Sequence, residues 1–150
     1  MLMEFTQEML LNGLLSGLIA TVVMTVFMMI GKATGMAPMD LLLMMGRKIL
    51  GSEAVEKKTR MFGMLQHLIV GTVWGIVYIA AVGNQLYFTE LSIRSGLLFA
   101  LIPWLIMMLV MMPMMGVGVF GLKKSPRVLV LTLLLHLIYG GTLGYIASVL

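Results

Sequence analysis

The sequence predicts an all-α integral membrane protein, a four-helix bundle built from two tandem two-helix repeats. Apolar residues make up 61% of the 150 residues and charged residues 11%, and the mean hydropathy is +1.08. This composition is far from that of a soluble domain. Four apolar stretches are each long enough to cross a hydrocarbon core about 30 Å thick, and short motifs recur along the chain. We therefore expect a single membrane domain over residues 1–150.

The four apolar stretches cover residues 10–31, 61–82, 93–115 and 128–150. None alternates like a β-strand, and in lipid only helices and closed barrels satisfy their own backbone hydrogen bonds. The sequence therefore predicts four transmembrane helices. The first is too long for the apolar core of a signal peptide, and no Lys or Arg precedes it, so we expect no cleaved leader.

Two pairs of motifs indicate an internal duplication. The segment that starts at His67 (HLIVGTVWG) resembles the one that starts at His136 (HLIYGGTLG), 69 positions later, and these are the two histidines of the chain. The motif Ser-Gly-Leu at 16–18 recurs at 95–97, an offset of 79. Because each repeat contains an even number of spans, both should cross the membrane in the same direction. The repeats cover about 10–82 and 93–150.

The basic residues predict an orientation. Nine of the ten Lys and Arg residues lie in residues 32–60 and 123–127, and the tenth is Arg94. The positive-inside bias makes both of these loops cytoplasmic and places both termini outside. Topology and anionic lipid explain the net charge of +4, so we expect the lipid bilayer as a partner and no nucleic acid. The absence of Cys excludes disulfides and thiolate metal sites.

The segments outside the spans are short. Residues 1–12 form an amphipathic lead-in that we expect on the outer surface. The run Gly35-Met-Ala-Pro-Met-Asp40 breaks the chain after the first span. Residues 41–50 then predict an interfacial helix in which Arg47 lies near Asp40 on the helical wheel, and a re-entrant segment is the alternative.

The second span is expected to extend into the cytoplasm as a solvated helix. Glu53 and Lys57, and likewise Glu56 and Arg60, stand at i,i+4 spacing, where opposite charges stabilise a helix.

Glycines mark the faces on which the helices should pack. Glycine four residues from glycine lets helix backbones approach closely, which is how helices in lipid gain packing energy. The predicted packing positions are Gly17, Gly71, Gly75, Gly140 and Gly144.

The two histidines are candidate cofactor ligands. His67 and His136 should lie at similar depth and face the bundle interior, and ionisable groups at such depth tend to be functional. One hypothesis is that they bind a single haem b or a metal ion across the pseudo-twofold axis, with the neighbouring glycines leaving room for a macrocycle. The alternative is that each neutral imidazole is a structural residue, hydrogen-bonded to a hydroxyl or a backbone carbonyl.

Methionine is abundant, at 18 of 150 residues. Thioethers suit Cu(I), but methionine is also an adaptable apolar filler, and packing is the preferred interpretation. In the third span Pro103 should free a backbone carbonyl and kink the helix, and the indole N–H of Trp104 needs an acceptor.

A series of motifs runs along nearly the whole chain. They are Ala20-Thr21, Met24-Thr25, Gly35, Pro38-Met39-Asp40, His67, Gly71, Trp74-Gly75, Tyr78, Pro103-Trp104, Met112-Pro-Met-Met-Gly116, Gly118, Phe120-Gly121, His136, Tyr139-Gly140 and Gly144. Together these motifs resemble a family of small prokaryotic four-span membrane proteins of unknown function. The resemblance implies a four-helix protein of a prokaryotic cytoplasmic membrane and implies no activity.

No enzyme signature is present: the spans contain no carboxylate pair, no HExxH and no phosphate loop. We expect a non-catalytic accessory or scaffold subunit of a larger membrane complex, or a homo-oligomer, with residues 39–50 as a main recognition surface. A haem- or metal-binding protein that uses His67 and His136 is the first alternative. A small transporter or channel is the second.

Overall fold

The computed structural model describes residues 6–86 and 88–150, and within them it is helical, without a strand. Helix α1 (Gln7–Ala33) is followed by the short α2 (Leu41–Leu50) and by α3 (Glu56–Gly83). Helix α4 (Ile93–Ile106) continues through one π turn, η1 (Met107–Met111), into α5 (Met112–Met114), and the 3₁₀ turn η2 (Val119–Gly121) precedes α6 (Arg127–Val149).

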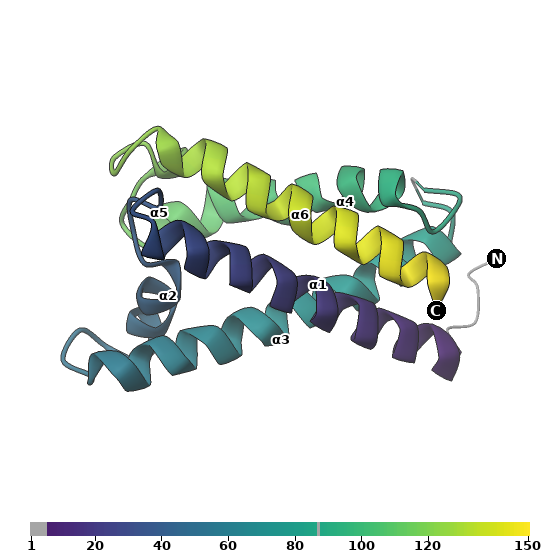
Figure 1. Cartoon of the computed structure of the whole chain (residues 1–150), viewed down its shortest axis with the longest axis horizontal. Helices are drawn as coiled ribbons and strands as arrows, with labels where there is room; N and C mark the ends of the chain where they lie inside the picture. The colour runs from purple at the N-terminus through teal and green to yellow at the C-terminus, as the bar shows by residue number, and fades with distance from the viewer. Residues whose placement is uncertain (1–5, 87) are drawn as a thin grey trace.

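Four helices of the described chain are long and apolar enough to cross a membrane, as the sequence predicts. They are Gln7–Ala33, Glu56–Gly83, Ile93–Met114 and Arg127–Val149. Figure 1 shows them side by side along the long axis, with the start of α1 and the end of α6 at one end and with α2 and α5 at the other. We call the half of the bundle that contains the start of α1 and the end of α6 the terminal half. The half that contains α2 and α5 is the loop half.

Helix starts follow local capping chemistry. The Thr6 side chain accepts a hydrogen bond from the Met9 amide at the start of α1, and Ser92 and Ser95 form a reciprocal capping box at the start of α4. Asp40 caps α2 by accepting from the Leu43 amide, at 3.1 Å. Sequence reasoning placed residues 1–12 in a surface lead-in; residues 1–5 lie outside the described chain, and Gln7 onward is part of α1.

The four long helices form two pairs. Helix α1 packs along α3, α4 packs along α6, and contact between α1 and α6 joins the pairs, whereas α3 and α4 meet at few positions. Glycines make both pairs close: a Cβ built on Gly17 would lie 2.9 Å from the Cα of Gly75, and one on Gly96 would lie 2.8 Å from the Cα of Gly144. Backbones this close leave no room for a side chain at these positions.

The terminal half is filled by aromatic and aliphatic side chains. Tyr78 and Phe99 are fully buried with ring centroids 5.2 Å apart, and Trp74 meets Phe99 edge-on at 5.9 Å. The Tyr78 hydroxyl forms a hydrogen bond of 2.7 Å with the Ser95 hydroxyl, so the polar end of the ring is satisfied. Asn12 Nδ2 donates to the Ala147 carbonyl and ties α1 to α6.

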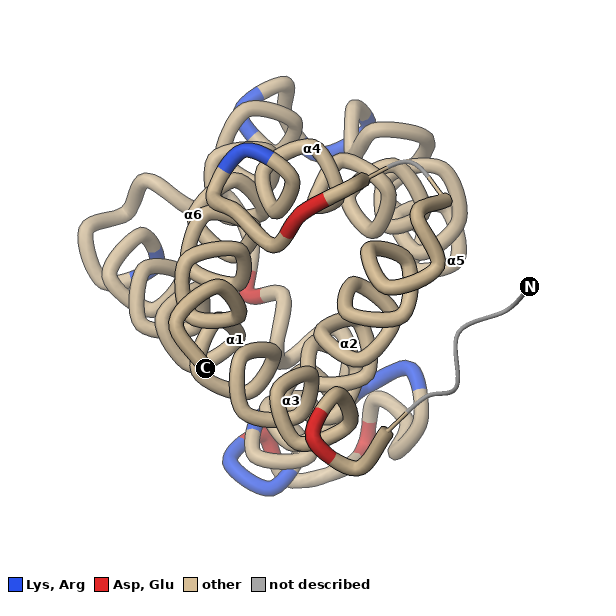
Figure 2. The backbone as a smooth tube through the Cα atoms, turned by 90° about the vertical axis from the view of Figure 1, so that its right-hand side faces the viewer, with Lys and Arg blue, Asp and Glu red and all other residues tan. Residues whose placement is uncertain are grey.

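Charged residues lie near the helix ends and in the connections. Between Arg60 and Glu90, between Arg94 and Lys123, and after Arg127 the sequence has no charged residue. Figure 2 views the bundle along its length and shows the few charged positions on an otherwise uncharged backbone. This distribution matches helices that cross an apolar layer.

Helix α2 is where the structure departs most from the sequence-based expectation. Its boundaries are as expected, but Asp40 pairs with Lys32 and Arg60 and not with Arg47. Asp40 is the N-cap, outside the helix, so a helical wheel does not describe its neighbours. The Arg60–Glu56 pair forms, at 2.6 Å, whereas Glu53 precedes the start of α3 and the i,i+4 rule does not apply to it.

Candidate functional site

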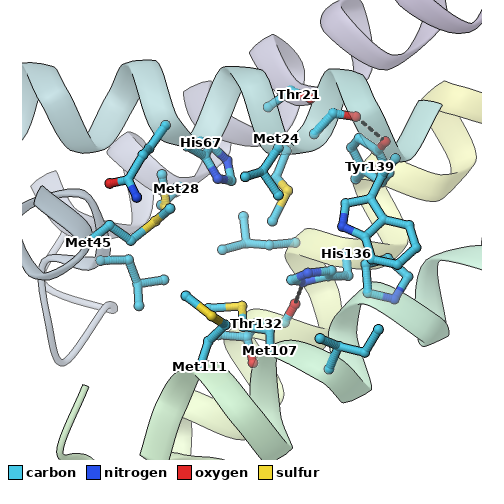
Figure 3. Close-up of a pocket in the computed structure, with 18 of the residues that line it drawn as sticks. Thr21, Met24, Met28, Met45, His67, Met107, Met111, Thr132, His136 and Tyr139 are labelled. Carbon is cyan, nitrogen blue, oxygen red and sulfur yellow. Dashed lines mark hydrogen bonds between the residues drawn. The ribbon is translucent and has the colours of Figure 1, made fainter. Parts of the chain in front are cut away.

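A chamber of about 240 Å³ lies between the two helix pairs, and both histidines line it. Figure 3 shows His67 of α3 and His136 of α6 on different sides of this space. The sequence motif that starts at each histidine therefore brings an imidazole from each helix pair to one cavity. The remaining lining residues are Thr21, Met24, Met28, Leu41, Met45, Gln66, Val70, Gly71, Trp74, Pro103, Ile106, Met107, Met111, Met115, Thr132, Leu135 and Tyr139.

His136 is held in one orientation by its own helix. The residue is 7% exposed, and its Nδ1 lies 2.8 Å from the Thr132 carbonyl oxygen one turn earlier. A carbonyl oxygen only accepts, so Nδ1 carries the proton, and in the neutral imidazole Nε2 is left with its lone pair. Histidines that bind metals are commonly oriented by a backbone carbonyl in this way.

His67 and its neighbour Gln66 present polar atoms without partners. The buried atoms His67 Nε2 and Gln66 Oε1 have no hydrogen-bond partner in the described chain, although both residues line the chamber. A buried polar atom without a partner costs roughly 1–3 kcal/mol, so such atoms need a reason in a native fold. No hydrogen bond at Nε2 in the described chain therefore supports the interpretation of His67 as a hydrogen-bonded core residue.

Six methionines line the same chamber. Met24 and Met28 come from α1, Met45 comes from α2, and Met107, Met111 and Met115 come from the segment that follows α4. Figure 3 shows labelled methionine side chains from these segments around the cavity. The sequence-based preference for packing holds for other members: Met108 and Met112 are fully buried in a cluster with Val128. Because the lining methionines come from several elements, helical periodicity in any one segment did not reveal the cluster.

A backbone irregularity carries two of these methionines, Met107 and Met111. The π turn at Met107–Met111 follows Pro103 by one helical turn, and π turns are frequent at functional sites. The expected acceptor for the Trp104 indole is found: its Nε1 lies 3.3 Å from Thr132 Oγ1. This contact joins the irregular helix to the turn of α6 that orients His136.

The chamber is closed toward the terminal half. The Tyr139 hydroxyl donates to the Gly71 carbonyl at 2.7 Å and links α6 to α3 across the two helix pairs. Tyr139 belongs to the same buried cluster as Tyr78 and Phe99, with Trp74 packed against it. Among the described residues, the aromatic cluster therefore closes the chamber at its end toward the terminal half.

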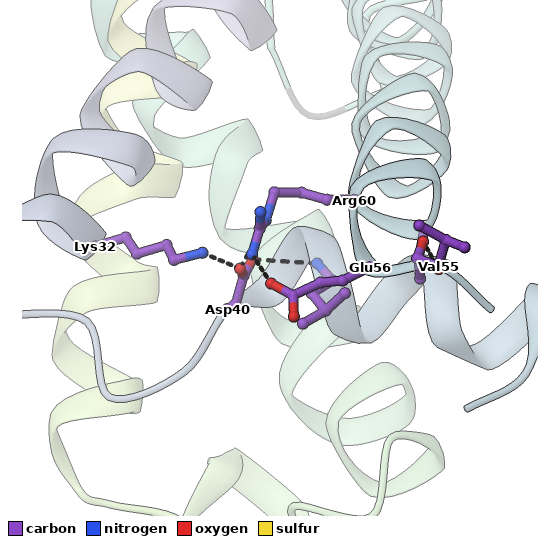
Figure 4. Close-up of polar contacts among 7 residues, drawn as sticks. Lys32, Asp40, Val55, Glu56 and Arg60 are labelled. Atoms are coloured by element: carbon purple, nitrogen blue, oxygen red, sulfur yellow. Dashed lines mark hydrogen bonds and ion pairs between the residues drawn. The ribbon is translucent and has the colours of Figure 1, made fainter. Parts of the chain in front are cut away.

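Helix α2 forms part of the wall at the loop half. It lies against α3 because Gly46 has no side chain: a Cβ there would lie 2.8 Å from the Thr59 carbonyl carbon. Asp40 fixes the start of α2, since it pairs with Lys32 at the end of α1 and with Arg60 of α3 at 2.9 Å (Figure 4). Met45 is consequently held against the chamber.

The Asp40 carboxylate is stabilised in its charged form. Burial by itself would raise the pKa of Asp40, but the hydrogen bonds from Lys32, the Leu43 amide and Arg60 outweigh it and hold this pKa below its ordinary value of 3.8. The side chain is 15% exposed, so these contacts are only partly screened by solvent.

Neighbouring helices occupy the space beside each of the predicted packing glycines. A Cβ built on Gly71 would lie 2.7 Å from Thr21 Cγ2, one on Gly140 would lie 2.6 Å from Ala100 Cβ, and Gly17, Gly75 and Gly144 meet backbone. The space that the haem hypothesis required beside these glycines is therefore occupied. The chamber volume also lies below the roughly 300–1,000 Å³ of pockets that hold drug-sized ligands, so the geometry favours a ligand smaller than a haem.

Sequence reasoning missed three residues of the site. Gln66 and Thr132 stand next to the histidine motifs, one before His67 and the other one turn before His136, but nothing in the sequence distinguishes them from polar residues of helix packing. Met45 was assigned to an interfacial helix, and its contribution to the chamber depends on how α2 folds back onto α3.

Comparison with known proteins gives a family and no activity. No curated protein and no solved structure matched the chain. One family, described as "Family of unknown function (DUF6789)", matches residues 7–150 and so covers all four long helices and the chamber. The resemblance noted from the sequence motifs is confirmed, and the chain belongs to the DUF6789 family.

Proposed function

We propose that this protein is a non-catalytic membrane protein that binds a small, electron-poor ligand in the chamber between its helix pairs. The observation that carries the proposal is a pair of buried atoms on adjacent residues of α3, His67 Nε2 and Gln66 Oε1, which have no hydrogen-bond partner among the described residues. Both residues line the cavity, and the amide oxygen is an acceptor. A ligand that donates hydrogen bonds or carries positive charge would satisfy the amide oxygen, and it would also satisfy Nε2 in the tautomer of His67 that carries its proton on Nδ1.

The rest of the lining supports the same kind of ligand. The chamber residues include no Asp, Glu, Lys or Arg, so recognition rests on neutral groups with lone pairs. Among the described lining residues, the Thr132 hydroxyl lies one turn from His136 but donates to the Val128 carbonyl at 2.7 Å. The histidines lie on separate helices, without a lining carboxylate to orient them as a catalytic pair. Binding is therefore better supported than catalysis. Because the aromatic cluster closes the chamber toward the terminal half, the geometry gives no support to an open channel.

Native mass spectrometry of protein extracted from membranes in mild detergent tests the proposal. We expect a small bound species on the wild type that is lost in His67→Ala and His136→Ala. Leu135→Trp, which fills the chamber, should also lose it, whereas Leu134→Trp, at an adjacent position that is 51% exposed, should keep it. A wild type without any bound species, or a species kept by all three chamber variants, contradicts the proposal.

We also propose two features of the architecture that the sequence predicts, the two tandem repeats and the orientation in the membrane. The offsets of 79 and 69 residues that relate the sequence motifs also relate Gly17 to Gly96 and Gly75 to Gly144, and each helix pair uses these glycines for its contact. This correspondence supports two tandem repeats.

The nine cations between the first and second and between the third and fourth spans support an orientation with both termini outside. A reporter after Leu150 should be external and one at Ser52 cytoplasmic, and the reverse pattern would contradict this orientation.

Assembly with a larger membrane complex or with further copies remains a prediction. Residues 39–50, which include helix α2, are one of the main recognition surfaces that the sequence predicts, and the end of this segment is exposed: Ile49 is 57% and Leu50 42% exposed. Purification in mild detergent that gives only a monomer would count against assembly, and it would leave the ligand-binding proposal unaffected.

A further inference from the structure

The chamber combines two kinds of donor atom, thioether sulfur and imidazole nitrogen. Six thioether side chains and two imidazoles line one cavity of about 240 Å³. They reach it from the described elements α1, α2, α3, α6 and the segment around η1, so the cavity is surrounded by soft donors on several sides. From this geometry, and resting on the ligand-binding function proposed above, we propose that the ligand is a monovalent soft metal ion, Cu(I).

Ligand chemistry selects this ion. Thioethers are soft ligands that suit Cu(I), whereas Mg²⁺, Ca²⁺ and Mn²⁺ need carboxylate, carbonyl or water oxygens. The described residues contain no group of three or more His, Cys, Asp or Glu side chains that could hold a metal. A tetrahedral zinc site, which uses such ligands, is therefore not supplied. The donors that are present are the ones that Cu(I) accepts.

The charge that a bound ion would bring into the chamber also favours a monovalent ion such as Cu(I). Moving an ion from water into an apolar interior is expensive, and neutral ligands leave the ion's charge uncompensated. The chamber has no carboxylate among its lining residues, so a divalent ion would keep its full double charge there. A monovalent ion held by neutral imidazoles and thioethers carries a smaller penalty. The neutral imidazole is the form of histidine that binds a metal.

Two local features prepare the donors for a metal. The hydrogen bond from His136 Nδ1 to the Thr132 carbonyl fixes the tautomer in which Nε2 has the free lone pair. His67 Nε2 has no partner in the described chain, and the π turn lies at the wall that carries Met107 and Met111. Helix packing alone explains neither the unpaired nitrogen nor the gathering of sulfur atoms around a space that they leave open.

The test is an anaerobic Cu(I) titration of metal-free, purified protein in competition with bathocuproine disulfonate, a coloured Cu(I) chelator. We expect the wild type to retain an equimolar amount of Cu(I). X-ray absorption of the retained copper should show sulfur and nitrogen neighbours. Zn²⁺ offered in the same way should be released to a chelator.

Adjacent methionines provide a matched control. The double variant Met107→Leu/Met111→Leu removes two lining thioethers, and His136→Ala removes an imidazole. Each should weaken Cu(I) binding by at least the roughly 10–100-fold that loss of an outer partner costs a metal site. Met108→Leu changes a fully buried methionine outside the chamber lining and should bind Cu(I) like the wild type. Size-exclusion profiles and the melting temperatures without metal show whether each variant is folded.

The outcomes separate the two proposals. If folded wild type surrenders all its Cu(I) to the chelator while native mass spectra still show a chamber-dependent bound species, the ligand is not copper and the ligand-binding function stands. If neither copper nor any other species binds, both proposals fail. Copper with only nitrogen and oxygen neighbours, or equal losses in Met108→Leu and in the double variant, would also overturn the copper site.

Discussion

The terminal half and the loop half of the bundle are made from the same long helices but are packed in opposite ways. In the terminal half glycine backbones touch and aromatic rings fill the interior, with Tyr78 and Leu143 both fully buried. In the loop half the helix pairs separate around a chamber lined by flexible methionines. A rigid half that closes the bundle and a looser half that leaves a cavity are what a binding site on a stable scaffold requires.

The difference has a physical origin in side-chain size along α3 and α6. Toward the terminal half these helices carry glycine at the contact positions, as at Gly75 and Gly144, so their partners approach to backbone contact. About two turns nearer the loop half they carry His67 and His136, and the helices must leave space for these side chains. Methionine surrounds that space without filling it, because its unbranched side chain adapts to irregular gaps.

Neighbouring glycines on α6 test how closely the packed half is built. A Cβ on Gly140 would lie 2.6 Å from Ala100 Cβ, whereas one on Gly141 would meet only Leu97 Cδ2, at an ordinary 3.7 Å. Gly140→Ala should destabilise the protein by about 1–3 kcal/mol or more through overpacking. Gly141→Ala should be neutral or stabilise by about 0.5–1 kcal/mol, because alanine is the better helix former. Thermal unfolding in detergent compares them, and equal melting temperatures would refute close packing at Gly140.

Much of this packed half could be predicted from the sequence, and much of the loop half could not. Hydropathy located the four long helices, and the spacing of Gly71, Gly75, Gly140 and Gly144 marked the surfaces on which they meet neighbouring helices. Such features are periodic within one helix, so a single sequence reveals them. The chamber is not periodic: it needs Met45 from α2 and Met107 from the π turn, and only the folded chain brings them together. The Asp40 pairings likewise depend on tertiary structure, since its partners lie 8 and 20 residues away.

Two adjacent methionines give the second comparison. Met108 is fully buried and packs with Met112 and Val128, whereas Met107 borders the chamber. Met108→Ala should cost about 2–5 kcal/mol because it empties a packed site. Met107→Ala should cost clearly less, since its side chain already faces a cavity on one side. Melting temperatures measured without metal would decide, and a larger loss for Met107→Ala would mean that the chamber wall is packed as tightly as the core.

The smallest expected effect concerns the attachment of α2, which completes the chamber wall. The folded-state pKa of Asp40 is depressed, so its contribution to stability is fully present above the unfolded value of about 3.8 and is lost as the pH falls through the lower folded pKa. Partly exposed ion pairs contribute only about 0.2–1 kcal/mol each, so local loosening of α2 is expected and global unfolding is not.

Hydrogen exchange of the Leu43 amide measures this loosening directly, because that amide donates to Asp40 Oδ1. Protection of Leu43 should fall as the pH drops below 4, after correction for the pH dependence of intrinsic exchange. In Asp40→Asn, which cannot ionise, protection should be lower at neutral pH and should lack this acidic transition. Amides in the terminal half, such as that of Leu143, should keep their protection in both proteins because no titrating group holds them. If Leu43 and Leu143 lost protection together, the two halves would unfold as one unit, and the contrast between a rigid scaffold and a separately attached wall would be wrong.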